Sequence, residues 1–187
     1  MPYQPYKIAG YHKLYYDPSG TLPTLAQYVG TTGDEGIVLT RETLIQPITS
    51  DELGPEAIID GVYQGANVTL EFVLQDINQD HVQALLHPFQ ESSDSAVQSR
   101  VGVAGQLGSG KAGMLYAEPI DGSPAYAAFG AGDATANQSR KFMGINVAPV
   151  VETLDATARF VPVRFQCYPF EVDSVLHFWE WVSALSV

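Results

Sequence analysis

The stretch IIDGVYQGANVTLEFVLQDIN, Ile58–Asn78, decides the fold that the sequence predicts. In its second half, side chains alternate with a period of two, which places them on opposite faces of a β-strand. A turn is expected just before this strand, because glycine and asparagine cluster there. One face is suited to a packed core, and the other must meet water, another subunit or a large partner. The core face carries Val68, Leu70, Phe72 and Leu74, and the opposite face carries Thr69, Glu71, Val73 and Gln75.

The composition indicates a folded chain that does not grip nucleic acid. Hydrophobic residues make up 45% of the 187 residues, which is enough to build a core in a single domain spanning residues 1–187. The formal net charge is −12, so the chain is poorly suited to neutralising phosphates or holding an anionic membrane surface. No apolar run has the length of a membrane span, and MPYQPYKIAG is unlike a signal peptide. We therefore expect a soluble protein made in the cytoplasm.

The remaining segments predict mostly strands and one helix. Asp80 is expected to cap a short helix that buries Val82, Leu85 and Leu86 and stops at Pro88. The tail VLHFWEWV fits either a closing strand or a helix. In the strand Val161–Tyr168, one face is apolar and the other carries Arg164, Gln166 and Tyr168. Further short strands are predicted at Tyr11–Tyr16, Val101–Ala104, Met114–Ala117 and Lys141–Val150. The predicted class is mainly β.

Gly30–Ala57 is predicted to be a long, weakly structured extension of the domain. Glycines and prolines interrupt it, and only Ile37–Thr40 and Leu44–Ile45 have strand character. Long excursions from compact domains tend to be functional. This one is interpreted as an arm or extended hairpin that orders against another molecule, with a solvated acidic loop as the alternative.

No motif in the sequence predicts catalysis. GQLGSGKA, Gly105–Ala112, approaches a phosphate-binding loop, but Ala112 replaces the hydroxyl that would hold magnesium, and Gly113 and Pro119 oppose the helix that must follow. Cys167 is the only cysteine and lies on an apolar strand face, which favours a core role. The four histidines lack metal-ligand spacing. We expect no enzyme activity, cofactor or metal.

Four segments in succession resemble the major tail, or tail tube, proteins of long-tailed bacteriophages. They are VGTTGDEGIVL (Val29–Leu39), IIDGVYQGANVTLEFVLQD (Ile58–Asp76), GVAGQLGSGKAGMLYAEP (Gly102–Pro119) and FVPVRFQCYPF (Phe160–Phe170). The resemblance spans most of the chain in order. It implies a β-sandwich or barrel-like fold with one short flanking helix and a long extended loop or hairpin arm.

The same resemblance implies a structural virion protein that assembles into rings, with six copies each, stacked as a hollow tube for DNA ejection. DNA would pass without specific binding. Other tail proteins would be partners: tape measure, terminator, baseplate and, in a contractile tail, sheath. Candidate channel-facing residues are Thr69, Glu71 and Gln75, and candidate subunit-seam residues are Arg164, Gln166 and Tyr168. Candidate inter-ring arm residues are Asp34, Glu35, Ile37, Leu39, Leu44 and Ile45. Deleting Asp34–Ile48 is then expected to abolish tube growth and to leave a folded subunit.

Three other hypotheses stay open at this level. A terminator or neck protein of the same tail would form isolated rings rather than tubes. A β-sandwich binding module would use its tyrosines and tryptophans as a platform for a sugar or a protein. A degenerate nucleotide-binding enzyme would bind ATP.

Overall fold

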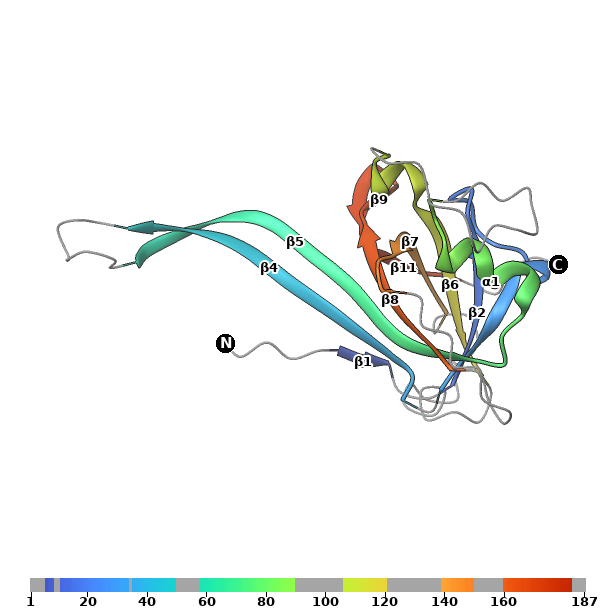
Figure 1. The fold of residues 1–187 in the computed structure, drawn as a ribbon. Coiled ribbons are helices and arrows are strands. Elements are labelled where there is room, and N and C mark those ends of the chain that lie inside the picture. The colour runs from blue at the N-terminus through green and yellow to red at the C-terminus, as the bar shows by residue number, and fades with distance from the viewer. Residues whose placement is uncertain are drawn as a thin grey trace, which may run out of the picture.

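The computed structural model describes the chain in seven segments: residues 6–8, 11–33, 35–49, 58–89, 106–120, 139–149 and 160–182. The fold is mainly β, with one α-helix among these residues (Figure 1). The strands are β1 (Tyr6–Ile8), β2 (His12–Asp17), β3 (Tyr28–Thr32), β4 (Ile37–Thr49), β5 (Ile58–Gln75), β6 (Gly113–Pro119), β7 (Arg140–Asn146), β8 (Val161–Tyr168), β9 (Phe170–Val172), β10 (Val175–His177) and β11 (Trp179–Trp181). The helix is α1 (Gln79–Leu86), and short 3₁₀ turns lie at Leu25–Gln27 and Gly108–Lys111.

Six of the strands close into a barrel. Going round it, β5 pairs with β3, β3 with β2, β2 with β6, β6 with β7, β7 with β8, and β8 again with β5, every pair being antiparallel. Closure removes the unpaired edges through which sheets aggregate. The barrel-like fold that the sequence predicts is confirmed.

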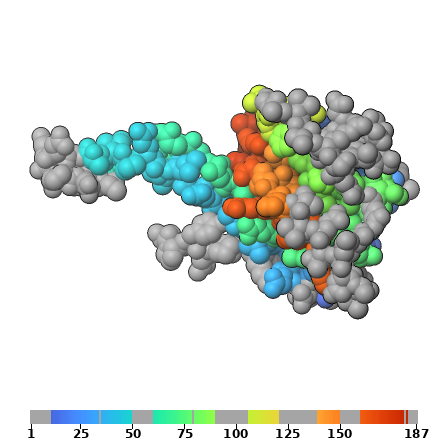
Figure 2. All heavy atoms as spheres, viewed as in Figure 1, coloured from blue at the N-terminus to red at the C-terminus, as the bar shows by residue number. Residues whose placement is uncertain are grey.

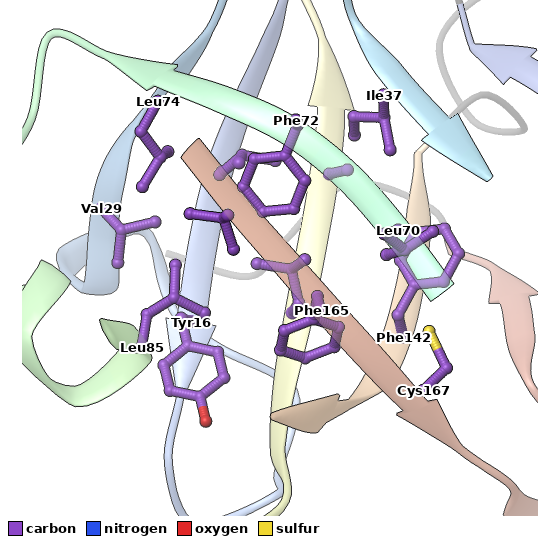
Figure 3. Packing of buried hydrophobic residues seen from close by; sticks show 14 of the residues in the cluster. Tyr16, Val29, Ile37, Leu70, Phe72, Leu74, Leu85, Phe142, Phe165 and Cys167 are labelled. Atoms are coloured by element: carbon purple, nitrogen blue, oxygen red, sulfur yellow. The ribbon is translucent and has the colours of Figure 1, made fainter. Parts of the chain in front are cut away.

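The barrel interior is filled by the alternating apolar face that organises the sequence. Val68, Leu70, Phe72 and Leu74 of β5 are all buried, and Phe165 and Cys167 of β8 meet them from the neighbouring strand. Figure 3 shows Leu70, Phe72, Leu74, Phe165 and Cys167 in one cluster with Tyr16, Val29, Ile37, Leu85 and Phe142. The alternation predicts the correct core face because β5 pairs with β8 in an unbroken register from Val68 to Leu74, without a bulge.

Helix α1 packs against β2, β3 and β7. Val82, Leu85 and Leu86 are buried, as predicted, but the cap is Asn78, whose side-chain oxygen accepts a hydrogen bond from the Asp80 amide at 3.1 Å. Asp80 instead lies in the first turn, where a carboxylate is favoured by the helix dipole.

Three sequence expectations about strands are corrected. β4 is one continuous strand through Pro47, not two fragments, because β5 offers it a partner along its whole length. β5 begins at Ile58, so the glycines before Val68 lie inside the strand rather than in a turn. The tail is neither a single strand nor a helix but the two short strands β10 and β11. The predicted strand at Val101–Ala104 lies outside the described residues.

Gly65 explains why the turn prediction failed. Leu44 faces Gly65 and Ile45 faces Tyr63, so Gln64 is an extra residue in a β-bulge. Gly65 has a φ of +132°, which L side chains rarely adopt. Glycine is therefore required for the bulge, not for a reversal of the chain.

The turn after β2 gives a testable pH dependence. Partial burial alone would raise the pKa of the Asp17 carboxyl, but hydrogen bonds from the Ser19 amide and the Thr21 hydroxyl outweigh this and hold the pKa below its usual value. A pKa lowered by folding stabilises the protein above the unfolded-state pKa of about 3.9, and the benefit is lost as pH falls through the folded-state pKa.

We expect Asp17→Asn to lower the free energy of unfolding by about 0.5–1 kcal/mol at pH 7, since the hydrogen bonds lie near the surface. The difference from wild type should shrink below pH 4 and vanish below the folded-state pKa. Urea denaturation at pH 7, 4 and 2.5 measures it, and a difference that persists unchanged at pH 2.5 would contradict the assignment.

Candidate functional site

The feature that the core does not explain is a two-stranded arm. It consists of Arg41–Thr49 of β4 paired with Ile58–Asn67 of β5, and it projects from the barrel (Figures 1 and 2). Every residue of Arg41–Thr49 is exposed, although the same strand is buried at Ile37 and Leu39. An isolated two-stranded ribbon is marginally stable in water. A partner that packs against the arm would therefore stabilise it.

Both faces of the arm carry exposed apolar side chains. We call them the core-side face, which continues the face of Leu39 and Leu70, and the outer-side face, which continues the face of Glu71. Residues directly opposite in an antiparallel pair lie on the same face. Ile45 and Tyr63, opposite each other on the core-side face, are 60% and 59% exposed. The outer-side face carries the exposed side chains Leu44, Ile48 and Val62.

The arm also lacks charge along most of its length. The segments Thr43–Thr49 and Gly61–Asn67 contain no Asp, Glu, Lys, Arg or His, in a chain of net charge −12. At the root of the arm, Arg41 and Glu42 are exposed on opposite faces. Natural proteins usually protect exposed strands with charged side chains. Their absence here, with apolar residues on both faces, is typical of a surface that is covered in an assembly.

Both backbone edges of the arm are open within the described part of the chain. β1 pairs with β4 only at Ile37–Leu39, and β8 pairs with β5 only from Val68 onward. Beyond these points β4 and β5 pair only with each other. Open edges allow another strand to add by backbone hydrogen bonds.

Two hollows lie on the described surface, and one of them is at the arm root. One, of about 520 Å³, continues the core-side face and is lined by residues that include Arg41, Tyr63, Leu176 and Trp179. The other, of about 480 Å³, contains no arm residue and lies farther along β5, where its lining includes Val38, Glu71, Pro162 and Arg164. Both are open depressions, and a partner that covers the core-side face of the arm root would fill the first.

The predicted channel and seam residues do not form two separate faces. Glu71 and Arg164 are directly opposite on β5 and β8 and form an ion pair of 3.4 Å, with both side chains more than half exposed. Thr69 is opposite Gln166 in the same pair of strands. The strand pairing thus brings the predicted channel set and the predicted seam set onto one outer face, which the sequence could not show because it does not give the order of strands.

Several of these residues are also less accessible than expected. Thr69 is buried, because it lies on a central strand between Thr40 and Gln166. Gln75 is half-buried, with its amide against Gly33. Tyr168 is half-buried, with its hydroxyl against Gly108. Of the predicted channel residues, only Glu71 presents an exposed side chain.

The predicted arm residues divide between the core and the arm. Ile37 and Leu39 are buried in the hydrophobic core, so their side chains do not reach the surface on which an inter-ring contact would form. Leu44 and Ile45 lie on the arm and are exposed. Glu35 is exposed in the connection between β3 and β4, and Asp34 lies outside the described residues. The predicted boundary of 30–57 is also shifted, because β3 belongs to the barrel while Ile58–Asn67 belongs to the arm.

Sequence reasoning missed Ile48, Val62 and Tyr63 as arm residues. The available signal was the uncharged, partly alternating run Thr43–Thr49, matched by a second uncharged run at Gly61–Asn67. Two uncharged runs on either side of an acidic segment are compatible with a hairpin. The glycines of the second run obscured that pattern.

The phosphate-loop interpretation fails on local structure. Gly108–Lys111 form a 3₁₀ turn that leads into strand β6 at Gly113, whereas a phosphate loop must open a helix. Gly105 lies outside the described residues. In the part of the chain with described side chains, no group of three or more His, Cys, Asp or Glu is placed to hold a metal ion. None of the helices within the described ranges is long and apolar enough to span a membrane.

Cys167 lies in the core, and burial raises the pKa of its thiol. The thiolate is the reactive form of cysteine. We expect the native thiol to react with the disulfide reagent DTNB at least about 100-fold more slowly than the thiol in denaturant, since reaction requires opening of the core. Time-resolved absorbance with and without guanidinium measures the ratio. Complete labelling of the native protein within minutes would contradict a core role.

No protein-family model matches the chain, and no curated protein gives a significant match to it.

Proposed function

We propose that this chain is a structural, self-assembling subunit that forms rings and stacks them into the hollow tail tube of a long-tailed bacteriophage. The observation that carries the proposal is the arm: an exposed ribbon, uncharged along most of its length, with apolar side chains on both faces and open backbone edges. The resemblance of four segments to tail tube proteins supplies the identity of the assembly. The barrel supplies a rigid body from which the arm can reach a neighbour.

The acidic composition supports passage of DNA without binding. A basic wall would release counterions from DNA and hold it, whereas a wall of like charge repels phosphates over about 10 Å at moderate salt. Glu71 is the remaining channel-facing candidate, and its ion pair with Arg164 reduces the net charge that this part of the surface presents. We propose a ring of six copies, assembly in the host cytoplasm, and contacts with other tail proteins at the ends of the tube.

The proposal is tested by assembly of the purified protein. Sedimentation velocity across a concentration series, with negative-stain electron microscopy of the same samples, should show a cooperative transition from subunits to long tubes. Isolated rings without tubes would favour a terminator or neck role. A protein that remains monomeric at every concentration would overturn self-assembly.

A ligand-binding module is the second candidate, and one observation favours it. The hollow of about 520 Å³ beside the arm root presents Tyr63 and Trp179 with Arg41 and Glu180. Aromatic side chains with nearby polar groups are typical of sugar sites. Glycan-array binding by a stable monomer would support this function, and tube formation without glycan binding would exclude it.

A further inference from the structure

We infer that the arms of neighbouring copies stack face to unlike face, with Arg41 on the core-side face of one arm against Glu42 on the outer-side face of the next. The inference rests on the proposed self-assembly and specifies its contact geometry. The partner is a second copy of this chain on each side of the arm.

Both faces of the arm carry apolar side chains that are stabilised by contact with a neighbour. Ile45 and Tyr63 are exposed on the core-side face, and Leu44, Ile48 and Val62 on the outer-side face. A partner on one face would leave the other apolar face in water. A sheet that packs on one side alone usually carries polar side chains on its other side. Two apolar faces therefore indicate two neighbours.

The area of the arm limits how strongly one face can bind a neighbour. At a rise of about 3.3 Å per residue, Thr43–Thr49 extends roughly 23 Å, and two strands with side chains are roughly 10 Å wide. One face of the arm then offers on the order of 230 Å², well below the roughly 800 Å² that each partner contributes to a stable interface. The contact between two copies must therefore extend beyond the arm, and the hollow of about 520 Å³ at the arm root lies where the core-side contact would continue.

The charges of Arg41 and Glu42 favour one way of packing the arms over the others. Arg41 and Glu42 are adjacent, so they lie at the same level of the ribbon but on opposite faces. When two arms point the same way, packing their core-side faces together places Arg41 near Arg41, and packing their outer-side faces together places Glu42 near Glu42. Packing unlike faces at the same level places Arg41 near Glu42. Within the part of the chain that the structure describes, neither residue has an ion-pair partner of its own.

The consequence is a head-to-tail arrangement. A like-face contact is two-fold related and by itself closes a dimer whose other apolar faces stay exposed, whereas unlike faces leave a free face at each end and continue as a ring or filament. Like charges placed against each other suppress wrong pairings. In a chain of net charge −12, the uncharged segments Thr43–Thr49 and Gly61–Asn67 let copies approach with little added repulsion.

The experiment uses charge reversal in the full chain. Arg41→Glu and Glu42→Arg each place like charges at every stacked contact, and each should raise the critical concentration for assembly at least about tenfold at 50 mM salt. The double variant R41E/E42R restores opposite charges and should assemble within about threefold of wild type. Most specifically, an equimolar mixture of the two single variants should assemble, because alternating copies recover both contacts.

Two measurements separate this inference from other causes. Lys13→Glu, an exposed reversal on β2 outside the arm, should assemble as wild type does. Raising the salt to 1 M, where the screening length is about 3 Å, should reduce the defect of each single variant. Near-UV circular dichroism confirms that each variant is folded.

The outcomes are distinct from those of the proposed function. If wild type never assembles, the proposed function fails. If wild type assembles and either single variant assembles equally well at low salt, the Arg41–Glu42 contact is wrong. If both single variants fail and neither the double variant nor the mixture recovers, unlike-face stacking is wrong while self-assembly stands.

Discussion

Replacing Thr43–Ala66 with a two-residue Asn-Gly turn is expected to give a folded barrel that no longer assembles. Glu42 and Asn67 are directly opposite on β4 and β5, so a two-residue turn can join them, and Asn-Gly favours the turn type that hairpins require. The excision removes the exposed apolar residues on both faces of the arm and leaves Ile37, Leu39, Val68 and Leu70 in the core.

We expect no tubes or rings from the excised variant at concentrations up to about 100-fold above the wild-type critical concentration, because loss of a repeated apolar contact of a few kcal/mol corresponds to a factor of this order. Sedimentation velocity and negative-stain microscopy measure assembly, and thermal unfolding shows whether the barrel persists. Normal polymerisation of the folded variant would remove the arm from the interface.

The structure also changes which deletion tests the arm. The sequence suggests deleting Asp34–Ile48. That deletion would remove the buried side chains of Ile37 and Leu39 and leave β5 without its β4 partner at Leu70. Loss of two buried aliphatic side chains costs about 2–5 kcal/mol each, which is comparable to the whole stability of a domain. That variant would fail to assemble because it fails to fold, and its failure would say nothing about the contact.

Local pattern predicted the parts of the fold that depend on alternation along one strand. The buried face of β5, the apolar face of β8 and the three buried residues of α1 all follow from periodicity and are confirmed. Barrel closure depends on which strands become neighbours, and alternation does not carry that information. For the same reason the outer residues Glu71 and Arg164 were predicted on different faces, although strand pairing places them within ion-pair distance.

Glycine was the largest source of error in predicting the site. The pattern around Gly61 and Gly65 predicts a turn, whereas both glycines lie inside β5, and the residues from Ile58 to Asn67 form one strand of the arm. In the structure, Gly65 forms a bulge, and a side chain at Gly61 would collide with the Cγ2 atom of Ile45 across the arm. Glycine in a strand marks a turn, a bulge or a close approach, and only the partner strand distinguishes these cases.

Two glycines that face each other in the barrel, Gly113 of β6 and Gly144 of β7, also allow neighbouring groups to approach closely. They lie beside the rings of Tyr16 and Phe165, which meet edge to face with centroids 6.3 Å apart. A Cβ at Gly144 would overlap the carbonyl oxygen of Gln166 and lie 2.6 Å from the Phe165 ring. A Cβ at Gly113 would overlap the Tyr16 ring. The two glycines thus make room for the aromatic pair at the centre of the core.

We expect Gly144→Ala to lower the free energy of unfolding by about 3 kcal/mol or more, because the obstructing atom is backbone and β7 must move away from β8. Gly110→Ala is the matched control, since a Cβ there meets nothing within 4 Å, and it should change the free energy of unfolding by less than about 0.5 kcal/mol. Urea denaturation of both variants beside wild type measures the difference. Equal stability of the two variants would mean that β7 and β8 do not approach as closely as their pairing in the closed barrel requires. The arm root on β5 is held by the same barrel through the β5–β8 pair, so its position would then also be in error.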